Sequence, residues 1–181
     1  MFPKIVNIVS TVNINVNLDL NFIAKNSYDF EYDPKSFNGI VKRFRNPYST
    51  ILLFPKNKFV ITGCTSEADS KRIAYKTRRM LHKLGIKAKL SKHEIKNIVA
   101  TGRIEGLDID NFVQLFESCF PECHYKLQKN KSMCFNWRGI KISLFPNGKV
   151  NFVGAKVFTQ IEKSFNDLID IIINKEKSFI V

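Results

Sequence analysis

The chain has 181 residues and a formal net charge of +13 at pH 7, from 29 Lys and Arg against 16 Asp and Glu. A hydrophobic fraction of 44% is typical of a globular protein and argues against disorder. No apolar run is long enough to span a bilayer and no signal peptide is visible, so we expect a soluble, intracellular protein. The surplus of positive charge favours a polyanionic partner, nucleic acid before a membrane surface, although a lysine-rich solvated surface is the simpler explanation.

The four cysteines give no recognisable metal motif. Cys119, Cys123, His124 and Cys134 could be imagined as zinc ligands, but their spacing fits no common zinc site, and Cys64 lies far away. We therefore expect reduced, structural thiols and no metal or other cofactor.

The first half of the chain predicts strands and helices in alternation. Apolar alternation, capping residues and turn residues indicate these boundaries. We predict a strand from Ile5 to Val12, a short helix from Asp19 to about Asn26, a strand from Phe37 to Arg45, a hairpin from Thr50 to Gly63, a long helix from Ser66 to Leu84, and an edge strand from Ile86 to Leu90.

An internal repeat organises the chain. The hairpin TILLFPKNKFVITG, which starts at Thr50, returns 91 residues later as KISLFPNGKVNFVG, which starts at Lys141. A second match, at an offset of 90, pairs IVNIVST from Ile5 with IKNIVAT from Ile95. Two matches in the same order at nearly one offset indicate a tandem duplication of a unit of about 90 residues.

The second half is expected to repeat the first. It predicts a short helix from Asp108 to Phe116, the hairpin from Lys141 to Gly154 and a long helix from Thr159 to about Asn174. Each unit then has the order β-α-β-β-β-α or close to it. We expect an α+β fold in which both long helices lie on one face of an antiparallel sheet, with units 1–88 and 89–181.

The opposite face of this sheet has no predicted cover. An uncovered patch of apolar and small polar side chains marks a binding surface. The alternative is an oligomer that buries the face, which would include a weak homodimer of the protein in the absence of DNA. In the first half, period-two alternation places on this face Asn7, Val9, Thr11, Thr50, Leu52, Phe54, Val60 and Thr62, with Phe37 beside them.

Several motifs together resemble the TATA-box-binding protein (TBP) family. They are VNIVSTV, YDPKSF, KRFRNP, ILLF, VITG and the helix start S-E-x-x-S. The resemblance covers nearly the whole chain and is strongest from Ile5 to Gly85. It implies a pseudo-symmetric saddle of two tandem repeats, with helices on the convex face of a curved antiparallel sheet. It also implies a nuclear general transcription initiation factor, not an enzyme, that binds and bends the TATA-box minor groove.

The resemblance assigns roles to individual residues. Asn7 and Asn97 match asparagines that hydrogen-bond to minor-groove acceptors, and Arg43 and Arg45 match phosphate contacts. Two pairs of phenylalanines match the wedges that enter base steps: Phe37 with Phe54, and Phe120 with Phe145. The expected contacts on the groove floor are Val9, Thr11, Leu52, Val60, Thr62, Val99, Thr101 and Val153.

Protein partners follow from the same resemblance. It implies transcription factors IIA and IIB, TBP-associated factors and the RNA polymerase machinery, in addition to double-stranded DNA with a TATA element. The long first-half helix is strongly basic, and its simplest explanation is a solvated face. On it, Lys76, Arg79 and Lys83 are candidate partner contacts. The acidic stirrup that the family offers to transcription factor IIB is reduced to Glu117 and Glu122.

The second half departs from the family. Alternation from Phe145 places Lys141 and Ser143 on the groove face, together with Asn151. About eight extra residues lie between Phe120 and Phe145, so Phe135 is an alternative wedge. These departures suggest an alternative, a divergent TBP-like factor with relaxed sequence preference. A DNA glycosylase, which can contain a related half-fold, is disfavoured because no helix-hairpin-helix with catalytic Lys and Asp accompanies it.

Overall fold

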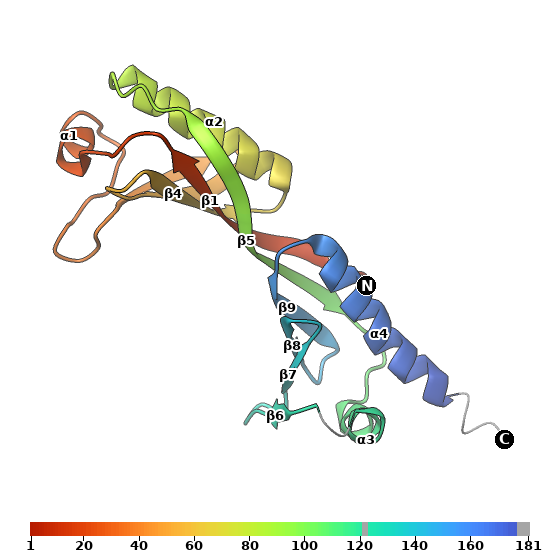
Figure 1. Cartoon of the computed structure of the whole chain (residues 1–181). Coiled ribbons are helices and arrows are strands. Elements are labelled where there is room, and N and C mark those ends of the chain that lie inside the picture. The colour runs from red at the N-terminus through yellow and green to blue at the C-terminus, as the bar shows by residue number, and fades with distance from the viewer. Residues whose placement is uncertain (121–122, 177–181) are drawn as a thin grey trace. The chain divides into compact units, whose positions relative to one another are not determined.

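The structure is a computed structural model that describes residues 1–120 and 123–176, the side chains of Cys119 and Asn174–Glu176 excepted (Figure 1). It divides into two compact units. The first unit is Val6–Lys96, and the second combines Met1–Ile5 with the chain from Asn97 onward. No helix among the described residues is long and apolar enough to cross a membrane.

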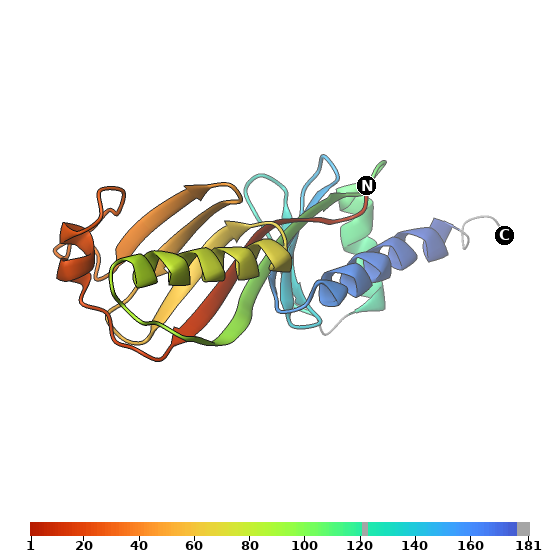
Figure 2. The same ribbon diagram turned by 90° about the horizontal axis from the view of Figure 1, so that it is seen from above.

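The first unit is an antiparallel sheet with a long helix on one face. The strands lie in the order β2-β3-β4-β1. Helix α2 runs along one side of these strands, as the view from above shows (Figure 2). The elements are β1 (Lys4–Ile14), α1 (Leu20–Lys25), β2 (Ile40–Arg45), β3 (Tyr48–Leu53), β4 (Lys58–Cys64) and α2 (Glu67–Lys83).

The second unit repeats this plan and adds one strand. Its strands lie in the order β5-β9-β8-β7-β6. The short strand β6 pairs with β7 and belongs to the segment that makes the second half longer. The elements are β5 (Leu90–Arg103), α3 (Ile109–Cys119), β6 (Tyr125–Leu127), β7 (Met133–Trp137), β8 (Ile140–Leu144), β9 (Lys149–Ala155) and α4 (Phe158–Glu176).

Each core lies between the sheet and its helices, on one face only. In the first unit Ile61 and Phe59 of β4 are fully buried together with Ile73 of α2. In the second unit the rings of Phe152 in β9 and Phe165 in α4 pack edge to face with centroids 6.3 Å apart. Alternate residues of every central strand are thus buried, which is the pattern of a sheet covered on one side.

The predicted helix starts are confirmed by their caps. Asp19 accepts a hydrogen bond from the Phe22 amide at 3.0 Å. Ser66 Oγ accepts one from the Asp69 amide at 3.1 Å, and Asp108 caps α3 in the same way. These bonds satisfy amides that a helix terminus otherwise leaves without partners.

One predicted strand begins later than expected, and another is absent. The Phe37 amide donates to the Asp33 carbonyl at 2.9 Å, so Phe37 belongs to a turn and β2 begins only at Ile40. The segment Ile86–Leu90 is not an edge strand. The Ile86 amide bonds back to Leu81 of α2 at 2.9 Å, and the chain enters β5 at Leu90. Because these amides are used in turns, they cannot join a strand ladder.

A buried polar chain links β1, α2 and β5 within the first unit. Ser10 Oγ lies 2.7 Å from Ser70 Oγ, and Ser70 Oγ lies 2.9 Å from His93 Nε2. Burial is the main cause that lowers the pKa of His93 from 6.5; Lys71 acts in the same direction and Glu67 opposes it. Protonation of His93 therefore works against folding.

This pKa shift predicts a loss of stability in mild acid. Below the ordinary histidine pKa the unfolded chain binds a proton that the folded chain resists, so the contribution is complete above about pH 6.5 and falls below it. The free energy of unfolding, measured with urea between about pH 7.5 and about pH 5.5, should decrease less in His93→Gln than in the wild type. Equal decreases in both proteins would contradict the assignment.

Candidate nucleic-acid interface

The sheet face opposite α2 carries the residues predicted for the first unit. Asn7, Val9 and Thr11 of β1 are half-buried and alternate with buried Ile8 and Ser10. The corresponding positions of β3 and β4 are half-buried as well: Thr50, Leu52, Val60 and Thr62. We call this surface, and its counterpart in the second unit, the open face.

Strand register aligns these residues in rows across the sheet. Leu52 pairs with Val41 on one side and with Val60 on the other. Val60 in turn pairs with Thr11 of β1. The middle of the first unit's open face is therefore mostly apolar, and it is bordered by the hydroxyls of Thr50 and Thr62, which pair with each other.

The first predicted phenylalanine pair is brought together. The rings of Phe37 and Phe54 meet edge to face with centroids 5.9 Å apart, and Phe37 remains 39% exposed. Gly39 makes room for this arrangement, because a Cβ at that position would lie only 2.7 Å from Phe37 Cε1. Sequence reasoning did not single out Gly39.

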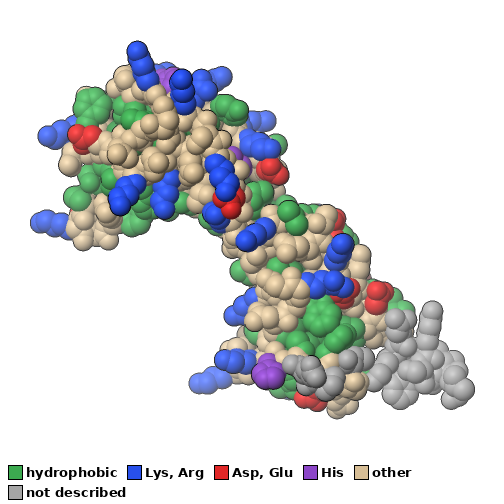
Figure 3. Space-filling view, viewed as in Figure 1, with side chains coloured by type: hydrophobic (Ala, Val, Ile, Leu, Met, Phe, Trp, Pro, Cys, Tyr) green, Lys and Arg blue, Asp and Glu red, His purple; other side chains and the backbone are tan. Residues whose placement is uncertain are grey.

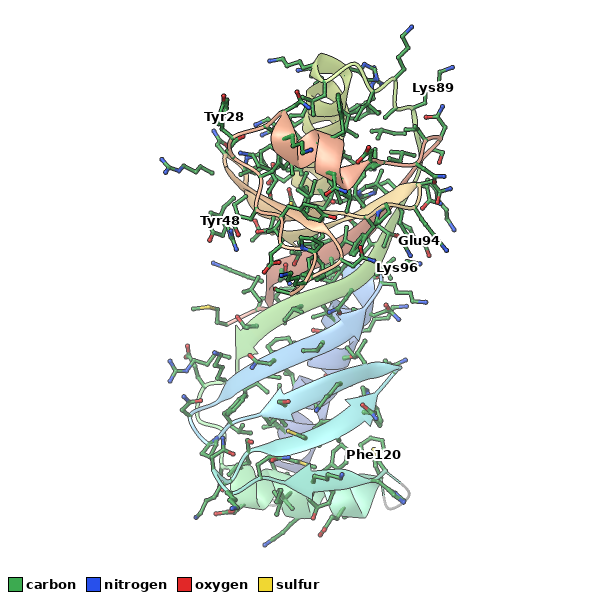
Figure 4. The ribbon with its side chains drawn as sticks, turned by 90° about the vertical axis from the view of Figure 1, so that its left-hand side faces the viewer. Tyr28, Tyr48, Lys89, Glu94, Lys96 and Phe120 are labelled. Carbon is green, nitrogen blue, oxygen red and sulfur yellow. The ribbon has the colours of Figure 1, made fainter. Side chains whose placement is uncertain are left out.

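The second predicted pair is not brought together in the described part of the chain. The Phe120 ring packs against Trp137, with centroids 4.6 Å apart, and also contacts Phe116. Figure 4 labels Phe120 in the second unit. Trp137 Nε1 donates to Asp167 of α4 at 2.6 Å, which places this cluster on the helix-covered side. Phe145 directly follows β8 and is half-buried. The first unit has no tryptophan equivalent to Trp137. Comparison of the two repeats therefore could not predict this contact.

Phe135 does not replace Phe120 on the open face. It is 3% exposed and its ring lies 4.6 Å from that of Phe116. Within β7 it lies two residues after Met133 and points to the same face of the sheet, and Met133 is fully buried. The alternative wedge considered from the sequence is therefore a core residue.

The open face of the second unit is more polar. Asn97, Val99 and Thr101 of β5 are half-buried, as are Ser143 and Asn151. Lys141 and Val153 are exposed and pair with each other across β8 and β9. Alternation thus placed these residues as the sequence predicted, including the polar ones that depart from the family pattern.

One hydrogen bond recurs in both units and orients the two asparagines. Asn7 Oδ1 accepts from the Gly63 amide at 2.7 Å, and Asn97 Oδ1 accepts from the Gly154 amide at 2.7 Å. Both glycines sit at irregularities of the strand register with φ of 92° and 107°. Because the oxygen is used, each asparagine presents its NH₂ group, which has no hydrogen-bond acceptor among the described residues.

Arg43 and Arg45 lie on the open-face side of the edge strand β2. They pair with Thr50 and Tyr48 of β3, and both guanidinium side chains are exposed. Arg43 forms an ion pair with Glu31, whose carboxylate raises the pKa of the arginine. Sequence reasoning missed Glu31, which lies nine residues before β2 and is brought beside it by an isolated bridge to Val41.

The remaining predicted contacts lie outside the open face. Arg79 and Lys83 of α2 are exposed and form no ion pair within the described residues, whereas Lys76 donates to the Asn46 carbonyl. Glu117 of α3 accepts from the Tyr125 hydroxyl, which raises the pKa of Tyr125. Figure 3 shows Lys and Arg side chains spread over this view of the molecule, with fewer acidic ones.

No metal site is assembled in the part of the chain that the structure describes. Its His, Cys, Asp and Glu residues form no group of three that could hold an ion. Cys64 is buried, and Cys134 donates to Ser143 Oγ at 3.3 Å. The side chain of Cys119 lies outside this description.

Comparison with known proteins gives one consistent match. The family model described as transcription factor TFIID (or TATA-binding protein, TBP) matches residues 2–84 and 92–175. The chain is 37% identical over 171 residues to the TATA-box-binding protein of Emericella nidulans, covering 90% of this chain and 61% of that protein. It is 36% identical over 171 residues to that of Schizosaccharomyces pombe, covering 90% of this chain and 71% of that protein.

The chain spans only part of some relatives, as in Spodoptera frugiperda, where a match of 36% identity over 178 residues covers 94% of this chain but 55% of the TATA-box-binding protein. The structure also resembles Methanococcus jannaschii TBP, with a TM-score of 0.79, 23% identity, and coverage of 96% of this chain and 99% of that one. The fold class predicted from the sequence is thereby confirmed. With both repeats matched, the chain belongs to the TATA-binding protein (TBP) family.

Proposed function

We propose that this protein is a general transcription initiation factor that binds the minor groove of TATA-containing DNA, bends it and nucleates the pre-initiation complex. The observation that carries the proposal is the recurring bond from a bulge glycine to an asparagine oxygen. It turns the NH₂ groups of Asn7 and Asn97 into oriented donors on the open face. In the minor groove, A·T pairs present only acceptors, so such donors match them.

Specificity then comes from what a G·C pair adds. The guanine N2 amine is a donor, and it projects into the groove where Asn7 and Asn97 would offer donors as well. Two donors facing each other leave both without acceptors, which costs more than the bond itself is worth. The apolar row with Leu52 and Val60 likewise offers a guanine amine no acceptor.

Bending is assigned to the exposed phenylalanines. Phe37, which is exposed, and Phe54, which is half-buried, form an edge-to-face aromatic pair on the open face. Proteins of this family are themselves the standard example of kinking by inserted apolar side chains, and that mode is carried over here. Pyrimidine–purine steps such as TA deform at low cost, which favours the TATA sequence.

Affinity is assigned to phosphate contacts and burial, with no catalytic step. Arg43 and Arg45 project beside the open face, and the net charge of +13 supplies further attraction. Cations released from the DNA make such binding weaken steeply with salt.

Protein partners are proposed on the surfaces away from the open face. Arg79 and Lys83 of α2, with Lys76, would offer a basic surface to transcription factor IIA or other regulators in the nucleus. Glu117 would contribute to a contact with transcription factor IIB; Glu122, the other acidic candidate, lies outside the described residues. TBP-associated factors and the RNA polymerase machinery complete the proposed set.

The function is tested by energy transfer between dyes at the two ends of a short TATA duplex. We expect a large gain in transfer on adding the protein to the TATA duplex and none with a GC-rich duplex. At high salt the same gain should require more protein than at moderate salt, because binding is weaker there. Equal binding to both duplexes without a bend would reject the proposal and leave a basic protein that only holds DNA.

Phe54→Ala should reduce the bend more than the rate of encounter. Removing the ring loses about 1.5–3 kcal/mol of apolar burial, which corresponds to a loss of affinity of about tenfold or more. Transfer at saturating protein and the association rate are measured together. Tyr75→Ala, which removes an exposed aromatic ring from α2, serves as the matched control. An unchanged bend with Phe54→Ala would remove Phe54 from the wedge.

Asn7→Asp should weaken TATA binding by about tenfold or more, because a carboxylate cannot donate to base acceptors. The aspartate can still accept from the Gly63 amide, so the fold should be retained. Affinity is measured by fluorescence anisotropy, with Asn166→Asp on the exposed side of α4 as the control for added charge. If both variants bind TATA equally well, Asn7 does not read the groove.

A further inference from the structure

The two open faces differ at one row of side chains. In the first unit the row across four strands is Val41, Leu52, Val60 and Thr11. In the second unit the row at equivalent positions is Cys134, Ser143, Asn151 and Thr101. The repeat offset relates Leu52 to Ser143 and Val60 to Asn151. The apolar pair Leu52 and Val60 of the first unit thus corresponds to two polar residues in the second unit, and we call the second row of four residues the polar row.

The polar row contains an acceptor without a donor. Asn151 Oδ1 is buried and has no hydrogen-bond partner within the described residues. Its neighbours do not supply one: the thiol of Cys134 donates to Ser143 Oγ at 3.3 Å. A buried acceptor left unpaired is destabilising and rare in native proteins, so it calls for an explanation. A partner that binds to this face is a physical source of the missing donor.

The chemistry of the minor groove limits what that donor can be. Base edges there present acceptors at every pair, and the one donor is the N2 amine of guanine. Phosphates carry only acceptors and would not complement Oδ1. An asparagine amide has an acceptor beside a donor, so it can accept from guanine N2 and donate to guanine N3 at the same time. Val60, at the equivalent position of the first unit, can do neither.

We propose, building on the proposed function, that Asn151 in the polar row reads a G·C pair in the part of the DNA site that faces the second unit. The amide oxygen is shielded in the free protein, and rotation about χ2, which has a broad profile in asparagine, turns it toward the groove. The hydroxyls of Ser143 and Thr101 flank the amide on the neighbouring strands. The protein then requires A·T pairs under one unit and accepts guanine under the other.

Inosine isolates the group in question. An I·C pair has the same minor-groove acceptors as G·C but lacks the N2 amine. The experiment changes each base pair of a TATA duplex in turn to G·C or to I·C and measures affinity by fluorescence anisotropy. The wild type is expected to bind G·C at least as tightly as I·C at one base pair. Asn151→Val should bind G·C there about five- to tenfold more weakly than I·C.

Two further variants separate reading from folding. Valine occupies the equivalent position in the first unit, so Asn151→Val should fold, which thermal melting checks. Asn151→Asp keeps the acceptor in an isosteric side chain and should keep or raise the preference for G·C over I·C, even if total affinity falls. Val60→Asn should create tolerance of G·C at a different base pair, because residue 60 belongs to the other unit.

The outcomes distinguish this inference from the function on which it rests. If the wild type binds and bends the TATA duplex but prefers I·C to G·C at every position, the inference is wrong and the proposed function stands. An unchanged G·C to I·C ratio in Asn151→Val has the same meaning. Failure to bind the unmodified TATA duplex would overturn both.

Discussion

The hydrogen bond between a bulge glycine and an asparagine oxygen, made once in each unit, is the constraint on which the open face depends. It requires an extra residue in the strand, and Gly63 and Gly154 supply it with positive φ. A Cβ on Gly63 would lie 3.2 Å from Ser49 Cα, so a larger residue would disturb β3 as well. The same bond fixes the amide of Asn7, which is otherwise free to turn about χ2.

Because each sheet is covered on one face only, the residues of a strand divide into a buried set and a set on the open face. The covered residues, such as Ile61 and Phe152, hold each unit together through apolar contact. The residues on the open face do not pack in the core, so they can change without destabilising it. This explains how Ser143 and Asn151 can stand where the first unit has Leu52 and Val60. Their neighbours Ile142 and Phe152 are apolar and buried. Between the repeats the buried positions stay apolar even where the residue changes, as from Ile61 to Phe152, whereas positions on the open face change from apolar to polar.

Much of the fold follows from local sequence rules. Period-two alternation predicted which residues of the central strands lie on the open face, including Lys141 and Asn151. Capping residues predicted the helix starts at Asp19, Ser66 and Asp108. These signals are local and survive without knowledge of the partners. The family resemblance supplied the expected fold, which the comparisons confirm.

The misplaced features depend on contacts that period-two alternation does not describe, some local and some between distant segments. Phe120 lies on a connection of non-repeated length, and its position follows from Trp137, whose indole is held by Asp167. No periodicity crosses such a connection, so its parity could not be predicted. Ile86 was misassigned because a hydrogen bond back to α2 competed with the sheet. The unpaired oxygen of Asn151 is likewise a property of its neighbours rather than of its residue type.

The ion pair between Arg43 and Glu31 has a consequence for how the proposed interface responds to salt. Each phosphate neutralised by a free cationic side chain releases condensed cations, and the logarithm of affinity falls with slope of about 0.9 per contact. In the free protein Arg43 is already paired with the carboxylate of Glu31. Moving this arginine to a phosphate breaks the ion pair and leaves the exposed Glu31 carboxylate close to the DNA, where it repels the phosphates. Part of the attraction gained at the phosphate is thereby offset by the neighbouring carboxylate, so this contact contributes less to binding than that of an arginine without an acidic neighbour.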